Sequence, residues 1–239
     1  MGYSTLFAAM SPLLLLQSRY VRHVTVRLPE PPGPRTGDVG TGARLRVLIV
    51  GDSAAAGVGA SSQEAALSGQ LVTALATTHR VTWSLIAKTG ATTLRTASHL
   101  SRLPPESFDI AVVSLGGNDV TAHRRISKWI GDVTTLATVL RTRFAVRLVV
   151  FSGLPPMQAF PALPQPLRWY LGKRARAYDA ALAEWAASQR DCEYFALRLS
   201  ADADLFAVDG MHPGPRGYHR WSIELAKRIR VRSDDIGVR

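Results

Sequence analysis

Cysteine is almost absent from the chain, since Cys192 is the only one among 239 residues. An internal disulfide is therefore excluded, and a reducing compartment is allowed but not required. The surrounding sequence, CEYFAL, indicates a strand and offers no second thiol for a metal site. We predict that Cys192 is buried and packs the core instead of acting as a nucleophile.

Long apolar runs are also lacking. The most apolar stretch, residues 5–16, is interrupted by Ser11 and Pro12 and is shorter than the roughly 20 residues that a membrane-spanning helix needs. No Lys or Arg precedes it, as a secretory signal would require, whereas Arg19 and Arg22 follow it. This order of apolar and basic residues favours a cytoplasmic location.

Residues 1–27 are therefore predicted to form an apolar and basic N-terminal arm, and two roles stay open for it. In the first, the arm contacts the inner face of the membrane, with apolar side chains in the interface and arginines on anionic headgroups. In the second, it packs on the protein's own body or mediates a dimer. The sequence does not favour one role over the other.

Acidic residues are few compared with basic ones: 18 Asp and Glu stand against 29 Lys and Arg, which gives a formal net charge of +11. Such a balance suits nucleic acid or an anionic membrane. The arginines are, however, spread singly or in small groups along the whole chain, without a long basic tract or a nucleic-acid-binding motif. We expect mostly solvated surface charge, a membrane contact as the second interpretation, and no specific nucleic-acid binding.

The chain divides into four segments. After the arm, residues 28–44 are rich in Pro and Gly and are predicted to be a linker. Residues 45–232 are predicted to form the main domain, and residues 233–239 a C-terminal tail. Within the main domain, short aliphatic runs alternate with longer stretches of helical periodicity. This alternation is typical of βα units around a parallel sheet.

Five strands are predicted, most of them too continuously apolar for a sheet with one solvated face. They cover residues 45–50, 81–87, 109–115, 146–151 and 192–197. The predicted helices include one that starts at a capping box of Ser61 and Glu64, and two at about 167–189 and 215–230. We predict an α/β fold of three layers, α/β/α, with a five-stranded, mainly parallel sheet. In such a fold, functional groups gather at the carboxyl ends of the strands.

Ser53 comes directly after the first predicted strand, in the segment GDSAAAGVG. The small residues around it leave room at its hydroxyl, and its position is at the sheet edge where α/β proteins present ligands. Ser53 is therefore a candidate nucleophile. The alternative is that it only caps a helix.

Two further segments follow neighbouring strands. The third strand ends in SLGGNDV, where Gly116 and Gly117 allow a ligand to approach the backbone and Asn118 offers an amide donor to an oxyanion. The second strand ends in AKTGATT, where Gly90 offers a backbone N–H. Both segments are also good turn sequences, so a purely structural role stays open for them.

The segment VDGMHPGPRGY contains a candidate base. Pro213 disfavours helical geometry at His212 and keeps this residue on a loop before the last helix. Asp209, three positions earlier, can orient the imidazole and stabilise its protonated form. The alternatives are a simple turn, or half of a metal site completed by Asp119 or His123, although no second cluster of metal-ligand spacing supports the latter.

Together these segments resemble the four blocks of the SGNH (GDSL) hydrolase family, in the same order. They are GDS at 51–53, Gly90, GGND at 116–119 and DGMHP at 209–213. The resemblance spans roughly residues 45–230 and implies a three-layer, flavodoxin-like fold. It also implies a serine hydrolase of carboxylic esters.

Roles for single residues follow from this resemblance. It implies Ser53 as nucleophile, His212 as general base and then acid, and Asp209 as the residue that orients His212. The backbone N–H groups of Ser53 and Gly90 and the side chain of Asn118 would form the oxyanion hole. Asp52 and Asp119 also match the motifs, and we expect them to hold turns by accepting bonds from backbone N–H groups.

The substrate is less defined than the chemistry. A Pro-rich loop at residues 152–170 lies at the same sheet edge, where Phe160, Leu163 and Trp169 either wall an acyl pocket or form a small core under the loop. With the apolar arm, this favours short- to medium-chain or lipid-like esters. Thioesters, acetylated sugars and acyl transfer to another alcohol use the same acyl-enzyme and stay open, as does a non-catalytic lipid- or membrane-binding protein. The predicted reaction requires neither a metal ion nor an organic cofactor.

Overall fold

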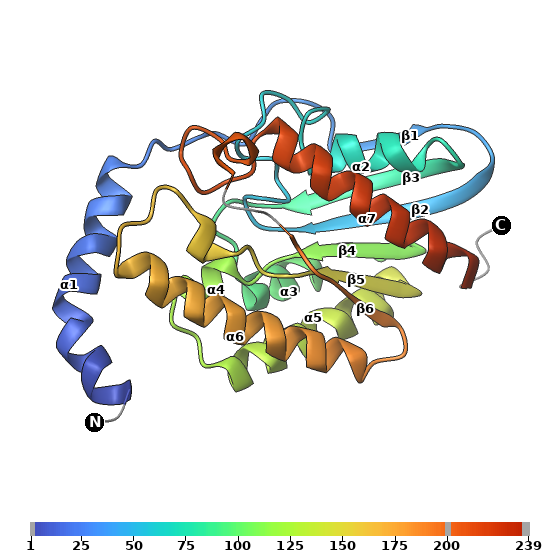
Figure 1. Cartoon of the computed structure of the whole chain (residues 1–239). Helices are drawn as coiled ribbons and strands as arrows, with labels where there is room; N and C mark the ends of the chain where they lie inside the picture. Colours follow the sequence, from blue (N-terminus) through green and yellow to red (C-terminus); the bar gives the residue numbers. More distant parts are fainter. Residues whose placement is uncertain (1–2, 199–201, 236–239) are drawn as a thin grey trace.

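Most strands of the central sheet run parallel (Figure 1). The computed structural model describes residues 3–198 and 202–235. Within these residues the sheet has six strands in the order β1-β3-β2-β4-β5-β6, and only β1 is antiparallel to its neighbour. The strands are β1 (Thr36–Val39), β2 (Ala43–Gly51), β3 (His79–Ala87), β4 (Ile110–Ser114), β5 (Leu148–Ser152) and β6 (Cys192–Phe195).

Helices cover both faces of the sheet, so the predicted three layers are confirmed (Figure 1). One core cluster joins the sheet to α2 (Leu67–Leu75) and α7 (Pro215–Asp235). The other joins it to α3 (Thr93–Leu100), α5 (Ile126–Phe144) and α6 (Leu167–Ala187). The remaining elements are α1 (Tyr3–Val24), α4 (Gly117–Thr121) and two short 3₁₀ turns, η1 (Met157–Ala159) and η2 (Ala203–Leu205).

The continuous apolar runs correctly indicated strands that are buried on both faces. Every residue of β4 and β5 is buried. Cys192 is buried in β6, as predicted, and burial raises the pKa of its thiol to about 12. The thiol is therefore protonated at neutral pH, which fits a packing role.

The segment predicted as a linker is an integral part of the sheet. Residues 36–39 form β1, which pairs antiparallel with β3 and adds a sixth strand to the five predicted. The same segment also holds the chain after β2, because the buried amide of Gln63 donates to the carbonyl groups of Pro31 and Ala56. The prediction missed this strand because TGDV has no apolar alternation.

The capping box predicted at Ser61 and Glu64 is wrong. Helix α2 begins later, at Leu67, and its N-cap residue Ala66 makes no side-chain capping bond. Gln63 accepts hydrogen bonds from the first turn of this helix instead. Its carbonyl accepts from the backbone N–H of Gly69, and its side-chain oxygen accepts from the Ser68 hydroxyl. The C-terminal end also differs from the prediction, because α7 continues to Asp235. The other residues of the predicted tail, 236–239, lie outside the described residues.

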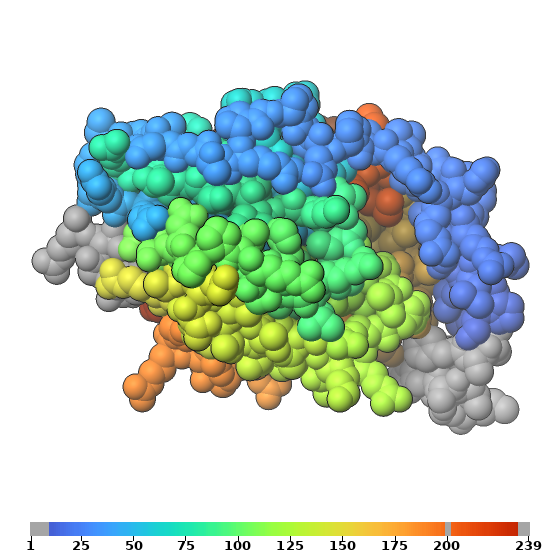
Figure 2. Space-filling model, turned by 180° about the vertical axis from the view of Figure 1, so that it is seen from behind, coloured from blue at the N-terminus to red at the C-terminus, as the bar shows by residue number. Residues whose placement is uncertain are grey.

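Most of the predicted N-terminal arm forms α1, which lies alongside the body (Figure 1). Leu14 and Val21 belong to the core cluster on the α6 side and are only 8% and 6% exposed. None of the helices in the described part of the chain is both long enough and apolar enough to cross a membrane. Seen from behind, the N-terminal segment lies along the outside of the body (Figure 2).

Candidate active site

Ser53 lies in a tight turn directly after β2, at the edge where the parallel strands β2, β3 and β4 end together. The carboxylate of Asp52 accepts a hydrogen bond from the backbone N–H of Ala54 at 3.1 Å, and the carbonyl of Ser53 accepts from Val58 N–H at 3.0 Å. Asp52 is buried, whereas Ser53 is half-buried. The turn therefore presents the serine hydroxyl at the edge of the sheet.

His212 lies on a loop that Asp209 organises. One carboxylate oxygen of Asp209 accepts from the backbone N–H groups of Met211 and His212, and the other lies 2.5 Å from His212 Nδ1. The carbonyl of His212 accepts from Ala207 N–H at 2.8 Å, which closes the loop. Pro215 starts α7, as predicted. The aspartate thus fixes both the backbone and the ring of the histidine.

The fold brings these two segments into contact. The Oγ atom of Ser53 lies 2.8 Å from Nε2 of His212, although 159 positions separate the two residues. Gly59 allows this approach: its φ is +101°, and a Cβ atom there would lie 2.4 Å from the Pro213 carbonyl oxygen. The buried hydroxyl of Tyr218 on α7 donates to the carbonyl of Val58 at 2.7 Å and ties the same two segments together.

Burial and hydrogen bonding set the charges at the site. Burial by itself would raise the pKa of Asp209, but the bonds from the His212 ring and from two backbone N–H groups outweigh it and lower this pKa. Asp209 is therefore ionised at neutral pH, and Nδ1 of His212 carries the proton that it donates. Nε2 is then free to accept the Ser53 proton. Asp52 differs, because burial raises its pKa to about 6.

Asn118 contacts the serine turn, and Gly90 lies in the segment after β3, the strand next to β2. The side-chain amide of Asn118 donates to the Ala91 carbonyl at 2.9 Å and to the carboxyl of Asp52 at 3.3 Å. Within the described residues, neither Ser53 nor Gly90 uses its backbone N–H in a hydrogen bond. Gly90 is exposed, and nothing lies within 4 Å of the position a Cβ would take. Within the described residues the two backbone N–H groups thus have no hydrogen-bond partner, whereas the Asn118 amide donates to two acceptors.

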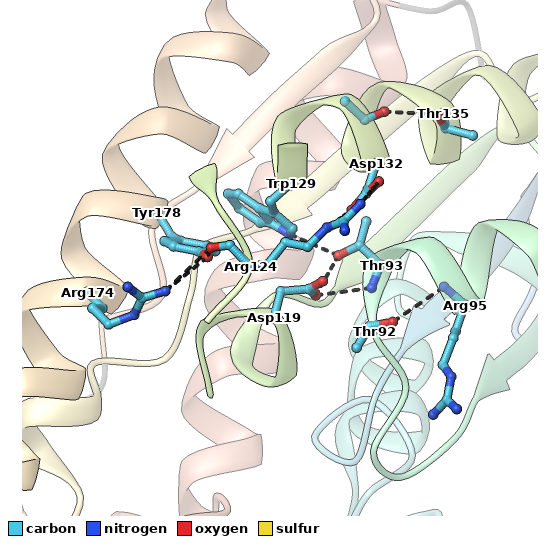
Figure 3. Close-up of polar contacts among 11 residues, drawn as sticks. Thr92, Thr93, Arg95, Asp119, Arg124, Trp129, Asp132, Thr135, Arg174 and Tyr178 are labelled. Atoms are coloured by element: carbon cyan, nitrogen blue, oxygen red, sulfur yellow. Dashed lines mark hydrogen bonds and ion pairs between the residues drawn. The ribbon is translucent and has the colours of Figure 1, made fainter. Parts of the chain in front are cut away.

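A buried polar network holds the GGND segment, residues 116–119, in place (Figure 3). The carboxylate of Asp119 accepts from the backbone N–H and the hydroxyl of Thr93, and this hydroxyl accepts from the Trp129 indole at 3.0 Å. Gly116 has a φ of +113°, which a side chain would disfavour. Helix α4, which carries Asn118, is therefore held by α3 and α5 together.

A cleft of about 960 Å³ opens beside the catalytic candidates and includes Asn118 and His212 in its lining. Phe160 and Leu163 are buried along this cleft. Trp169 is not one of the lining residues within the described part of the chain. It is 38% exposed on α6, with Lys173 over its ring. The structure thus places two of the three predicted pocket residues on the cleft.

The described residues contain no cluster of three or more His, Cys, Asp or Glu side chains that could hold a metal ion. The two residues considered as partners for a metal site have other contacts. Asp119 binds Thr93, and the ring of His123 stacks on Tyr170. The Asp209–His212 pair is instead directed at Ser53.

Sequence reasoning missed Glu30, which holds the loop that carries Gly90. Its carboxylate accepts from both the backbone N–H and the hydroxyl of Thr89 at 2.7 Å, and it pairs with Arg35. Arg35 in turn donates to the Ala87 carbonyl at the end of β3. Glu30 lies 59 positions before Thr89 in a Pro-rich segment, so no local pattern signalled this contact.

Comparison with known proteins places the chain in a wider group. Residues 49–220 match the model of the GDSL-like Lipase/Acylhydrolase family. The GDSL-like esterase Rv1075c of Mycobacterium tuberculosis (strain ATCC 25618 / H37Rv) is 32% identical over an alignment of 186 residues that covers 73% of this chain. The chain spans 58% of the length of that curated relative.

Solved structures share the fold. A carbohydrate esterase family 2 enzyme of Corynascus thermopiles (Myceliophthora fergusii) has a TM-score of 0.64 and 15% identity, over 85% of this chain and 68% of that chain. The psychrotrophic esterase EstA of Pseudoalteromonas sp. has a TM-score of 0.60 and 17% identity, over 79% of this chain and 98% of that chain. At such identities the likeness concerns the fold alone.

Proposed function

Since the chain belongs to the GDSL-like lipase/acylhydrolase family, we propose that it hydrolyses carboxylic esters through an acyl-enzyme formed on Ser53. One observation supports this most directly. Ser53 Oγ, the His212 ring and the Asp209 carboxylate form a continuous hydrogen-bonded chain, with distances of 2.8 and 2.5 Å. A serine next to a base that a third group orients is the arrangement that nucleophilic catalysis requires.

In the first half of the reaction, Nε2 of His212 takes the proton of Ser53 as Oγ attacks the ester carbonyl. Asp209 stabilises the imidazolium that forms. The negative oxygen of the tetrahedral intermediate would accept from the backbone N–H groups of Ser53 and Gly90 and from the Asn118 amide. The imidazolium then protonates the leaving alcohol, the bond between carbonyl carbon and alcohol oxygen breaks, and the acyl group stays on Ser53.

In the second half, water attacks the acyl carbonyl. His212 takes a proton from this water, and the same three donors bind the oxyanion. The intermediate collapses, Ser53 Oγ leaves and regains its proton from His212, and the carboxylic acid is released. An alcohol acceptor in place of water would give acyl transfer. Hydrolysis is the reaction we propose, because the family model that the chain matches is one of lipases and acylhydrolases.

The cleft favours an apolar acyl group over an acetylated sugar. Phe160 and Leu163 line it together with Met157, and a hydrocarbon chain that enters between these side chains loses its contact with water. We propose that these three residues contact the acyl chain. The preferred substrates are then short- to medium-chain or lipid-like esters.

The test is turnover of p-nitrophenyl esters with acyl chains of two to twelve carbons by the protein and by Ser53→Ala. Labelling by a fluorophosphonate probe is measured in parallel. Ser61→Ala is the matched control, because Ser61 is exposed in the segment that follows the same turn. We expect that Ser53→Ala loses both labelling and turnover, while Ser61→Ala keeps both. Equal turnover by Ser53→Ala and the unchanged protein would refute the assignment.

A further inference from the structure

Helix α1 and the residues after it line the cleft that also includes His212, and they lie outside the part of the chain that matches the family model. The family match begins at residue 49, whereas Leu14, Val21 and Val26 all line the cleft. The same cleft is lined by Asn118 and His212. The N-terminal segment therefore closes one side of a space that opens directly onto the catalytic candidates.

The inner face of α1 is built into the protein core. Leu14 and Val21 are buried and belong to the same cluster as Phe160 and Leu163 on the opposite side of the cleft. Leu14 and Val21 are seven residues apart, so they lie on the same face of the helix. Burial of both side chains favours this placement of α1 over one in which the helix stands away from the body.

Gln17 fixes the position of α1 on the body. Its side-chain nitrogen donates to the Gln165 carbonyl at 2.7 Å, and its side-chain oxygen accepts from the Leu167 backbone N–H at 3.0 Å. Leu167 is the first residue of α6, so its N–H has no partner within that helix. These two hydrogen bonds of Gln17 hold α1 at one rim of the cleft and leave the space toward His212 open.

The side chains that line the cleft indicate the kind of ligand that it binds. The α1 side contributes Leu14, Val21 and Val26, and the opposite side contributes Met157, Phe160 and Leu163. Arg22 and Arg27 also line the cleft but are exposed, so the charge is on the solvent side. The volume of about 960 Å³ is at the upper end of the range for small-molecule sites, and an acetyl group would leave most of it empty.

We propose that α1 and residues 25–28 form the outer wall of the acyl-binding site, so that a medium-length acyl chain lies between α1 and the η1–α6 segment. This inference rests on the proposed ester hydrolysis and adds to it the chain-length specificity. Each methylene that moves from water into the cleft should raise kcat/KM by a factor of about 4, until the cleft is full. Decanoyl esters should therefore be better substrates than acetyl esters.

The experiment compares two double variants of the full chain. Leu14→Ser with Val21→Ser changes two side chains that line the cleft. Leu16→Ser with Val24→Ser makes the same changes at two exposed positions of α1 outside the lining. For each protein, kcat/KM is measured with p-nitrophenyl decanoate and p-nitrophenyl acetate. The rates of Ser53 labelling by long- and short-chain alkyl fluorophosphonates give a second readout that needs no turnover.

We expect the inner variant to lower the decanoate-to-acetate ratio by about tenfold or more, and the outer variant to leave it unchanged. The acetate rate of each variant is an internal reference for correct folding. If the inner variant does not fold, Gln17→Ala and Leu14→Trp replace it. Gln17→Ala removes the hydrogen bonds that hold α1 in place, and Leu14→Trp narrows the cleft. Both should lower the decanoate-to-acetate ratio.

Two failures are distinguishable. If the unchanged protein cleaves esters through Ser53 but the inner variants keep its decanoate-to-acetate ratio, α1 is not the acyl wall and the proposed hydrolysis still stands. A preference of the unchanged protein for acetate over decanoate would overturn the acyl wall in the same way. If no ester is cleaved through Ser53, the proposed function itself fails.

Discussion

The side-chain amide of Asn118 lies 3.3 Å from the buried carboxyl of Asp52 and 2.9 Å from the Ala91 carbonyl. One side chain after β4 thus contacts the segments that follow β2 and β3. This places its amide beside the Ser53 turn without any bond to Ser53 itself. The short bond to Ala91 holds the side chain in position, and the longer bond to Asp52 is the one that an oxyanion would replace.

Asn118→Ala should therefore reduce kcat by about 100- to 1,000-fold, because one of three oxyanion donors is lost. KM should change little, since the oxyanion exists only in the transition state. Steady-state kinetics with a p-nitrophenyl ester tests this, and thermal unfolding of the variant checks that the loss is not one of folding. A kcat within a factor of about 3 of the original would remove Asn118 from the oxyanion hole.

Ser53→Ala and His212→Ala should each abolish most of the activity, and the double variant should be no worse than either single one. The two side chains form one hydrogen-bonded unit at 2.8 Å, so once either is missing the other has no function left to lose. The comparison requires kcat/KM of the three variants on one ester. Losses that multiply would mean that the two residues act independently.

Asp52→Asn should change how stability depends on pH. Burial raises the pKa of Asp52 from 3.8 to about 6, so the folded protein keeps the proton between these values while the unfolded chain has released it. The contribution of Asp52 to the free energy of unfolding is fully present below about pH 4 and is lost as the pH rises through 6.

The variant has no such proton to release. Its free energy of unfolding should therefore improve relative to the original protein by up to about 3 kcal/mol between pH 4 and pH 7. Urea unfolding at four pH values measures this difference. The neighbouring side chains of His212 and Asp119 are the same in both proteins, so a difference that does not vary with pH would contradict the raised pKa.

Glu30→Ala should lower kcat while leaving the Ser53–His212 pair intact. The carboxylate of Glu30 binds the backbone N–H and the hydroxyl of Thr89, the residue before Gly90. Without it, the backbone donor at Gly90 is less well placed, and we expect a loss of about tenfold. Labelling of Ser53 by a fluorophosphonate should persist. Asp38→Ala is the control, because Asp38 pairs with Arg80 in an exposed contact of β1 and β3.

The exposed flank of α1 should bind anionic vesicles. Leu13, Leu16, Tyr20 and Val24 are exposed at helical spacing, and Arg19 and Arg22 are exposed on the same helix. Apolar side chains beside arginines complement an anionic lipid surface.

Leu16→Ser with Val24→Ser should weaken co-sedimentation with phosphatidylserine vesicles several-fold, and Leu14→Ser with Val21→Ser should weaken it less. Added salt should weaken binding of the original protein. Equal binding by both double variants would exclude this flank as the lipid contact.

The order of strands and motifs allowed the main features of the fold to be predicted. Ser53, Gly90 and Asn118 each follow a strand of a parallel sheet, and the ends of such strands meet at one edge whatever the length of the helices between them. The place of His212 followed from the proline after it and from the helix that begins at Pro215.

The features that were not predicted depend on contacts between residues far apart in the sequence. Gln17 binds Leu167 across 150 positions, and Gln63 binds Pro31 across 32, and neither contact leaves a local periodicity. Trp169 was considered as a wall of the acyl pocket, but on α6 it lies beside Lys173 and outside the lining of the cleft in the described part of the chain. Such outcomes are decided by tertiary packing.

The four residues of β1 have a consequence for the protein outside its active site. They occupy the backbone groups of β3 from Val81 to Ser84 on the side that faces away from β2. A chain trimmed to begin after Val39 would leave this row of amides and carbonyls unprotected, and a second molecule could extend the sheet there. Such a shortened chain should aggregate through intermolecular β pairing. The N-terminal segment therefore also keeps the protein from aggregating at this edge of the sheet.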